Sequence, residues 1–249
     1  GLLDKLSAGR RLSDGRVTAY GLGLRWNEVD GKRFVGHGGS HPGYKSYFLL
    51  DPAAKTGMIV VSNREDANTY KMARDCMAAL NGLSLPETNC TIPDGLYVTE
   101  SGPFWLEMRN GIANWLDSED TLYDIGDGWF SSLSPSSPVE LRWTGTELEG
   151  EIGYVSRRLK PVTPKPVYRE LDGHWQASPY GASFDIKDGH LIMGIGPARR
   201  AMPLEDLGQG RALFTLHDGP WTKRVCLHKL DDNRVELVLS RARMIEYVR

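Results

Sequence analysis

The chain has 249 residues, 40% of them hydrophobic and 25% charged, which is ordinary for a folded globular protein. Its formal net charge is −2 with both signs interspersed, so there is no basic stripe for nucleic acid or for an anionic membrane surface. No apolar run approaches the roughly 20 residues that a membrane-spanning helix needs. We therefore expect partners that are small molecules or peptides, and neither nucleic acid nor membrane.

The cysteines and histidines argue against stabilising bridges and metal sites. Cys76, Cys90 and Cys226 are odd in number and far apart, which disfavours a disulfide framework and fits a reducing, cytoplasmic compartment. We expect all three to be buried as small apolar residues. The histidines lack ligand spacing and no phosphate-binding glycine loop precedes a helix, so we expect no metal and no cofactor.

Four stretches of strand character open the chain. They are Val17 to Trp26, Arg33 to Val35 running into Gly36-His37-Gly38-Gly39, Tyr44 to Leu50, and Met58 to Ser62. A helix is predicted next, with Asp66 as its N-cap and Asn81-Gly82 as its stop. Its apolar face is predicted to consist of Tyr70, Ala73, Met77 and Leu80. This α/β unit, residues 1–85, is the first of three expected domains.

From Pro86 onward, glycines and prolines separate short alternating segments, the pattern of antiparallel barrels. The region also repeats itself, since Gly95-Leu96-Tyr97 and Asn110-Gly111 return as Gly173-His174-Trp175 and Asp188-Gly189 at one common offset. We expect two lipocalin-like β-barrels, residues 86–164 and 165–249, joined by a stiff proline-rich linker at 161–166. The predicted fold class is therefore mostly β.

The segment Gly36-His37-Gly38-Gly39 points to chemistry. Glycines at 38 and 39 let a substrate backbone approach a strand closely, with the His37 side chain beside it. The reaction class that uses this combination needs an activated serine, yet the sequence contains no Ser-x-x-Lys and no Tyr-x-Asn. Because the first residue is Gly1 and not Met, we expect the chain to be the later part of an enzyme whose nucleophile lies upstream.

Several motifs together carry a family resemblance. Gly36-His37-Gly38-Gly39, Pro42-Gly43-Tyr44, Asp51-Pro52 and Val60-Val61-Ser62-Asn63 resemble the closing third of a penicillin-recognising serine hydrolase domain of the beta-lactamase-like superfamily. With two repeated barrels after it, the chain resembles the D-aminopeptidase family. The resemblance implies a serine hydrolase that removes N-terminal D-residues from peptides, amides or esters through an acyl-enzyme. We expect small peptide or amide substrates with an N-terminal D-residue, and a homodimer.

The resemblance also assigns roles to residues. His37 would be the catalytic residue of this chain, acting on the proton relay or the substrate, and Gly38 and Gly39 would leave room for the scissile group. Asp218, in a loop of the second barrel, would pair with the substrate ammonium, although a plain hairpin turn at that place is the alternative. Lys55-Thr56-Gly57 copies a beta-lactamase motif in letters only, because it falls in a hairpin connection. We predict that this chain alone hydrolyses nothing.

Two other functions stay open. The barrels would form a non-catalytic module if they bound a small apolar ligand, although Leu106, Met108, Ile112 and Trp115 are large enough to fill an interior. An esterase or carboxypeptidase relative of the same superfamily would instead prefer substrates without a free α-amino group.

Overall fold

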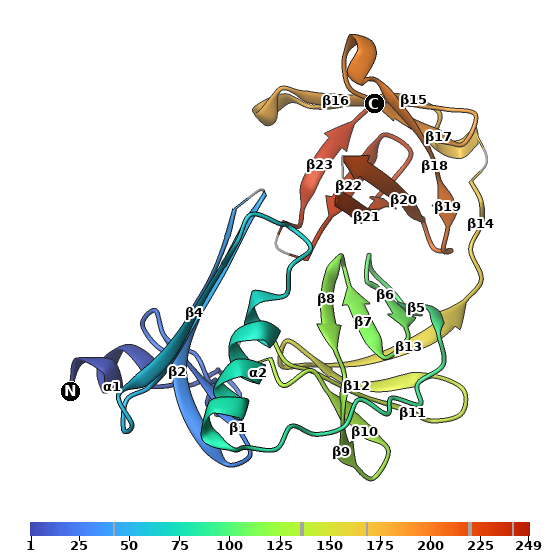
Figure 1. The fold of residues 1–249 in the computed structure, drawn as a ribbon. Coiled ribbons are helices and arrows are strands. Elements are labelled where there is room, and N and C mark those ends of the chain that lie inside the picture. Colours follow the sequence, from blue (N-terminus) through green and yellow to red (C-terminus); the bar gives the residue numbers. More distant parts are fainter. Residues whose placement is uncertain (42, 135–136, 168, 219–220, 241) are drawn as a thin grey trace. The chain divides into compact units, whose positions relative to one another are not determined.

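The computed structural model describes residues 1–41, 43–134, 137–167, 169–218, 221–240 and 242–249, and of Asp218 and Trp221 only the backbone (Figure 1). Two compact units form within the chain, and each is described by itself. The first comprises Gly1–Cys90, Leu122–Leu141 and Glu151–Ser156, and the second Thr91–Thr121, Arg142–Gly150 and Arg157–Arg249. The expected domain boundaries after residues 85 and 164 stay a prediction.

An antiparallel four-stranded sheet belongs to the first unit. Its order is β1 (Arg25–Val29), β2 (Lys32–His41), β3 (Tyr44–Asp51) and β4 (Thr56–Ser62). The last three coincide with predicted strands, and the His-Gly-Gly segment lies inside β2. The turn between β3 and β4 holds Lys55, which is exposed and has a φ of 55°.

The strand expected over residues 17–26 is wrong for most of its length. Gly23 has a φ of 131°, which an extended strand does not adopt. The N–H groups of Leu22 and Leu24 both donate to the carbonyl oxygen of Leu6, at 2.7 and 3.2 Å, at the end of helix α1 (Leu2–Ser7). These hydrogen bonds fold the segment back on α1, so that only its last two residues join β1.

Helix α2 (Thr69–Asn81) shares a buried core with the four-stranded sheet. Asn68 and not Asp66 is its N-cap, because the Asn68 side chain accepts the Lys71 N–H at 2.9 Å. Gly82 ends the helix with a φ of 63°, as predicted. Leu80 is 66% exposed and so does not belong to the buried face, contrary to expectation. The core consists of Val29, Phe34, Tyr47, Leu49, Ala73, Met77 and Ala78.

The second sheet has nine strands. Their order is β8 (Ser118–Thr121), β7 (Ile112–Trp115), β6 (Trp105–Arg109), β5 (Gly95–Thr99), β13 (Val155–Val162), β12 (Leu148–Ile152), β11 (Val139–Trp143), β10 (Trp129–Ser131) and β9 (Tyr123–Gly126). Strands β8 and β9 stand at opposite ends of this order, yet only Leu122 separates them in the chain. The sheet is therefore nearly closed, as a barrel requires.

The third sheet has ten strands and lies in the second unit. Their order is β14 (Lys165–Pro166), β19 (Glu205–Asp206), β20 (Arg211–Asp218), β21 (Trp221–Lys229), β22 (Arg234–Val238), β23 (Ile245–Val248), β15 (Gly173–Ala177), β16 (Ala182–Lys187), β17 (His190–Met193) and β18 (Arg200–Pro203). Short 3₁₀ helices are η1 (Arg169–Leu171), η2 (Ser178–Tyr180) and η3 (Gly196–Ala198). This second barrel-like sheet, with the first, confirms the predicted fold class.

The repeat seen in the sequence is present at two hairpin turns. Asn110 and Gly111, with φ of 50° and 73°, join β6 to β7. Asp188 and Gly189, with φ of 49° and 71°, join β16 to β17. Positive φ at both central residues is the type I′ geometry that suits a two-residue hairpin.

The proline-rich stretch 161–166 is not a linker. Pro161 and Val162 pair with β5 as the end of β13, and Lys165 and Pro166 form β14. Strand β14 stands at an edge of its sheet, where a proline without an N–H costs no ladder hydrogen bond. Spacing alone could not tell this edge strand from a polyproline segment.

The cysteines differ from one another. Cys226 is buried, and that burial raises the pKa of its thiol to about 12. Cys76 is exposed and Cys90 half-buried, so the expectation that all three are buried is wrong. In the part of the chain that the structure describes, no helix is long and apolar enough to cross a membrane.

Candidate active site

His37 lies in β2 on the face of the sheet that points away from α2. Successive side chains of a strand alternate between faces, so Phe34 and Gly38 point toward the α2 core whereas His37 and Gly39 point the other way. His37 stands opposite Phe48 of β3 and is half-buried. The imidazole is therefore held by a strand and reachable from one side.

Tyr20 is the polar partner of His37. Its hydroxyl lies 2.7 Å from the His37 Nε2, and the two rings meet edge to face with centroids 5.7 Å apart. The hydroxyl donates if Nε2 is unprotonated and accepts if Nε2 carries the proton. The Arg25 guanidinium carbon lies 5.8 Å from the Tyr20 ring centroid and 5.4 Å from that of Tyr47. The His37 imidazole, the Tyr20 phenol and the Arg25 guanidinium are thus adjacent in that order. The first two can hold or pass a proton, and the third is a fixed positive charge beside them.

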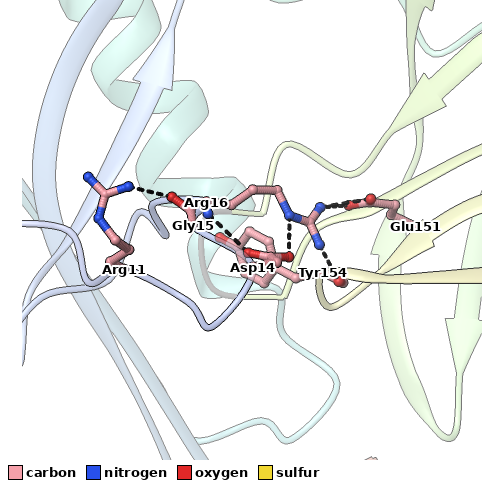
Figure 2. Close-up of polar contacts among 6 residues, drawn as sticks. All are labelled: Arg11, Asp14, Gly15, Arg16, Glu151 and Tyr154. Carbon is pink, nitrogen blue, oxygen red and sulfur yellow. Dashed lines mark hydrogen bonds and ion pairs between the residues drawn. The ribbon is translucent and has the colours of Figure 1, made fainter.

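Arg16 anchors the loop that carries Tyr20 (Figure 2). Its Nη1 lies 2.7 and 2.6 Å from the two carboxylate oxygens of Glu151, and its Nη2 donates to the Tyr154 carbonyl at 2.7 Å. Its Nε donates to Asp14 within the same loop, at 2.8 Å. The planar guanidinium uses its whole donor edge, which gives the loop one orientation.

The glycines around His37 have different surroundings. A Cβ on Gly38 would lie 3.0 Å from the Tyr47 ring and 3.5 Å from the Arg25 guanidinium. A Cβ on Gly39 would instead meet the Ser46 hydroxyl, which can rotate away. A side chain at position 38 would therefore clash with Tyr47. The glycine at position 39 instead leaves the sheet surface beside His37 free of a side chain. The substrate role expected of both stays a prediction.

Strand β2 continues past the end of its neighbour β1. Pairing with β1 ends where Arg25 stands opposite Gly36, whereas β3 pairs with β2 as far as His41. On the β1 side, residues 37–41 have no partner strand among the described residues. A free strand edge can accept an extended peptide through main-chain hydrogen bonds, and this one begins at His37.

A groove of about 520 Å³ opens elsewhere on the first unit. Its lining includes Trp26, Glu28 and Arg33, and Arg33 Nε is 3.1 Å from the Glu28 carboxylate. The other lining residues are Gly9, Val17, Thr18, Ala19 and Leu133. His37, Gly38 and Gly39 do not line it, so this groove is not the substrate site that the sequence predicts at these residues.

Asp218 is the last residue of β20 and pairs with Trp221 of β21. This pairing is the hairpin that the alternative reading expected. The Asp218 side chain, together with Gly219 and Pro220, lies outside the described residues. Its contact with a substrate ammonium therefore stays a prediction.

The β20–β21 hairpin extends past the strands beside it. β19 pairs with β20 at residues 212–213 and β22 pairs with β21 at residues 226–229, so the described residues farther along form a two-stranded ribbon. Arg224 holds the ribbon at its base, with Nη1 2.9 Å from Glu107 and Nη2 2.5 Å from Glu205. Asp117 accepts the Arg224 N–H and also pairs with Lys223. Four charged contacts thus fix the segment that leads to Asp218.

Across the described residues, no group of three His, Cys, Asp or Glu side chains is placed to hold a metal ion. Tyr20 and Arg16 are the site residues that sequence reasoning missed. The one available signal is Gly21-Leu22-Gly23 directly after Tyr20, which indicates a bend and not a continuous strand.

Comparison with known proteins gives a consistent result. Residues 1–80 match the family described as Beta-lactamase. The chain is 42% identical over 142 residues to a D-aminopeptidase of Brucella ovis, covering 55% of this chain and 24% of the relative. It is 27% identical over 149 residues to a D-aminopeptidase of Brucella melitensis, covering 58% and 26%. The chain thus spans about a quarter of the length of the curated relatives it matches.

A solved structure, that of the octameric penicillin-binding protein homologue from Pyrococcus abyssi, aligns with 99% of this chain and 41% of its own. The identity is 14% and the TM-score 0.30. So loose a superposition supports no conclusion about assembly, and the expected homodimer stays a prediction.

Proposed function

This chain is a relative of the beta-lactamase-like D-aminopeptidases, and from that premise we propose that it supplies one wall of the active site of a serine hydrolase. The reaction is removal of an N-terminal D-residue from a peptide, amide or ester through an acyl-enzyme. The observation that carries the proposal is the Tyr20–His37 hydrogen bond beside the free edge of β2. Because the sequence has no Ser-x-x-Lys, the serine belongs to polypeptide outside these 249 residues.

His37 is the group that acts on the reacting atoms. A neutral serine is a weak nucleophile, and an amine leaving group needs a proton, so the reaction requires a positioned acid–base group. The Tyr20 hydroxyl occupies Nε2 and fixes the imidazole plane. Nδ1 is then the nitrogen that faces the substrate or the proton relay, and no residue that the structure describes binds it.

The edge of β2 would bind the substrate backbone. An extended peptide that adds to residues 37–41 takes main-chain hydrogen bonds from the strand and lays its amide along His37. Gly39 lies on the same face as His37, so a side chain there would narrow the approach. This arrangement supports the expected substrate-binding role of Gly39, whereas Gly38, on the opposite face, would offer a substrate only its main-chain groups.

The test uses the chain joined to the serine-bearing part of its native protein and D-alanine p-nitroanilide as substrate. His37→Ala should lower kcat/KM by about 100-fold or more, the usual loss for one acid–base group. Tyr20→Phe should lower kcat about tenfold with little change in KM, because Tyr20 only positions the imidazole. His190→Ala, an exposed histidine of β17, is the matched control. A His37→Ala enzyme within twofold of the parent would refute the role.

The two alternatives make different predictions. An esterase or carboxypeptidase relative would cleave N-acetylated substrates as well as free amines, and Asp218→Asn would then affect both equally. In an aminopeptidase, Asp218→Asn should weaken the binding of free-amine substrates more than the binding of N-acetylated substrates. A ligand-binding barrel is disfavoured for the ten-stranded sheet, because a continuous core that includes Trp175, Phe184 and Phe214 fills the described part of its interior.

We keep three further expectations as proposals. The 249-residue chain alone should release no p-nitroaniline, since it has no serine nucleophile motif. The protein should be a homodimer, which light scattering would test. A cytoplasmic location would be tested by fractionation.

A further inference from the structure

Two arginines converge on one aromatic pair in the second unit. Phe104 and Trp115 stack with ring centroids 5.6 Å apart and planes 9° apart. The Arg157 guanidinium carbon lies 4.1 Å from the Phe104 centroid and 5.0 Å from that of Trp115, and the Arg243 carbon lies 5.4 Å from Phe104. Aromatic faces attract both cations, yet the two cations repel each other.

No carboxylate balances this pair in the described parts of the chain. Burial and the charge of Arg243 lower the pKa of the Arg157 guanidinium, and no acidic side chain opposes that shift. The neighbouring Arg158 shows the contrast, because its Nη1 lies 3.3 Å from Glu147. Two positive charges are therefore held together without a counter-ion from the described residues.

Arg157 also leaves a hydrogen-bond donor unused. Its Nε is buried and has no acceptor among the residues that the structure describes. A buried donor without an acceptor lowers stability, and more so when it is charged. That buried nitrogen is closed to a ligand, but an oxyanion beside the two guanidinium groups would offset their mutual repulsion.

We infer that Arg157 and Arg243 form a binding site for a small oxyanion, a carboxylate or phosphate group of a ligand. The aromatic rings lie against the guanidinium faces, which leaves the N–H edges for a ligand, and such edges match carboxylate and phosphate oxygens in pairs. Arg157 is half-buried and Arg243 exposed, so a ligand can reach the pair from solvent. The inference does not depend on the proposed hydrolase function.

Isothermal titration of the whole chain tests the site, with inorganic phosphate and acetate as probes and chloride at equal ionic strength as the reference. We expect saturable binding of one probe per chain above the chloride background. Arg157→Gln and Arg243→Gln should each weaken it by about tenfold or more, the effect of losing charged hydrogen bonds. Arg157→Lys should weaken it less, because it keeps the charge but loses the planar fork. Arg158→Gln, the neighbour with its own acidic partners, should leave it unchanged.

Two results would overturn the inference. One is binding of phosphate and acetate no stronger than the chloride background. The other is undiminished binding in Arg243→Gln, whose exposed side chain can be replaced without unfolding the chain even if Arg157→Gln does not fold.

Discussion

Tyr97 and Trp175 make the same hydrogen bond in the two barrel-like sheets. Each side chain donates to the carbonyl oxygen four residues earlier. The Tyr97 hydroxyl donates to Pro93 at 2.7 Å, and the Trp175 indole N–H donates to Leu171 at 2.9 Å. Each is the third residue of its strand, β5 or β15, and is at most 2% exposed. The repeat in the sequence is therefore accompanied by the same local side-chain hydrogen bond in both sheets.

Removing these two donors should destabilise the chain, and the size of the loss should depend on whether a cavity is left behind. Tyr97→Phe loses one hydrogen bond and should lower the free energy of unfolding by about 1 kcal/mol. Trp175→Phe loses the bond and also leaves a cavity, so about 3 kcal/mol is expected. Urea unfolding would measure both, with Tyr180→Phe as a control because Tyr180 is 69% exposed. Equal, negligible losses would mean that the two bonds contribute nothing.

Gly38→Ala and Gly39→Ala should behave differently although the residues are adjacent. The new Cβ at position 38 meets the buried Tyr47 ring, so a loss of roughly 1–3 kcal/mol in unfolding free energy is expected. At position 39 it meets only a rotatable hydroxyl, and the change should stay below about 1 kcal/mol. In the serine-bearing protein, Gly39→Ala should lower kcat/KM while the fold is kept. A stable Gly38→Ala chain would contradict the packing argument.

Arg16→Ala should loosen the loop that carries Tyr20 without unfolding the protein. Its contacts are exposed, so the melting temperature should fall by no more than about 3 °C. Hydrogen exchange should quicken at the N–H groups of Arg10 and Thr18, which bond across the loop. Arg33→Ala, another exposed arginine of the same unit, is the matched control. Unchanged exchange in the loop would show that Arg16 does not hold it.

Asp120 should make stability depend on pH. Burial raises the pKa of its carboxyl to about 7 from 3.8. The folded state then binds more protons than the unfolded state between these values, so stability falls as the pH rises through that window. Asp120→Asn should therefore raise the unfolding free energy at pH 8 by up to about 4 kcal/mol and have little effect near pH 4. Urea unfolding at both pH values decides, with the exposed Asp127→Asn as reference.

The sequence predicts an element correctly where the hydrophobic pattern and the signals for the element's ends agree. Strands β3 and β4 and the end of α2 at Gly82 follow from alternating apolar residues and a left-handed stop. The helix start was misplaced because Asp66 and Asn68 are both good caps, and only the Lys71 hydrogen bond selects between them. The prediction of a linker at 161–166 is wrong because a proline in an edge strand and a proline in a spacer look alike in the sequence.

The site could be predicted in part. His37 is identified by its glycine neighbours, which are local in the sequence. Tyr20 is brought to it by hydrogen bonds from Leu22 and Leu24 to α1 and by the Arg16 contacts to residues 151–154, none of which has a local signal. Contacts between distant segments depend on the tertiary fold, and propensity and spacing do not encode them.

The two type I′ turns also bear on how the chain folds. Asn110-Gly111 and Asp188-Gly189 each close a hairpin of neighbouring strands, and such hairpins form in about 1–10 μs. The pairing of β13 with β5 joins residues far apart in the chain and pays a larger loop-closure entropy. We therefore expect the folding of each barrel-like sheet to start at its own hairpin, β6–β7 in one and β16–β17 in the other. The repeated turn thus gives the chain two independent folding nuclei.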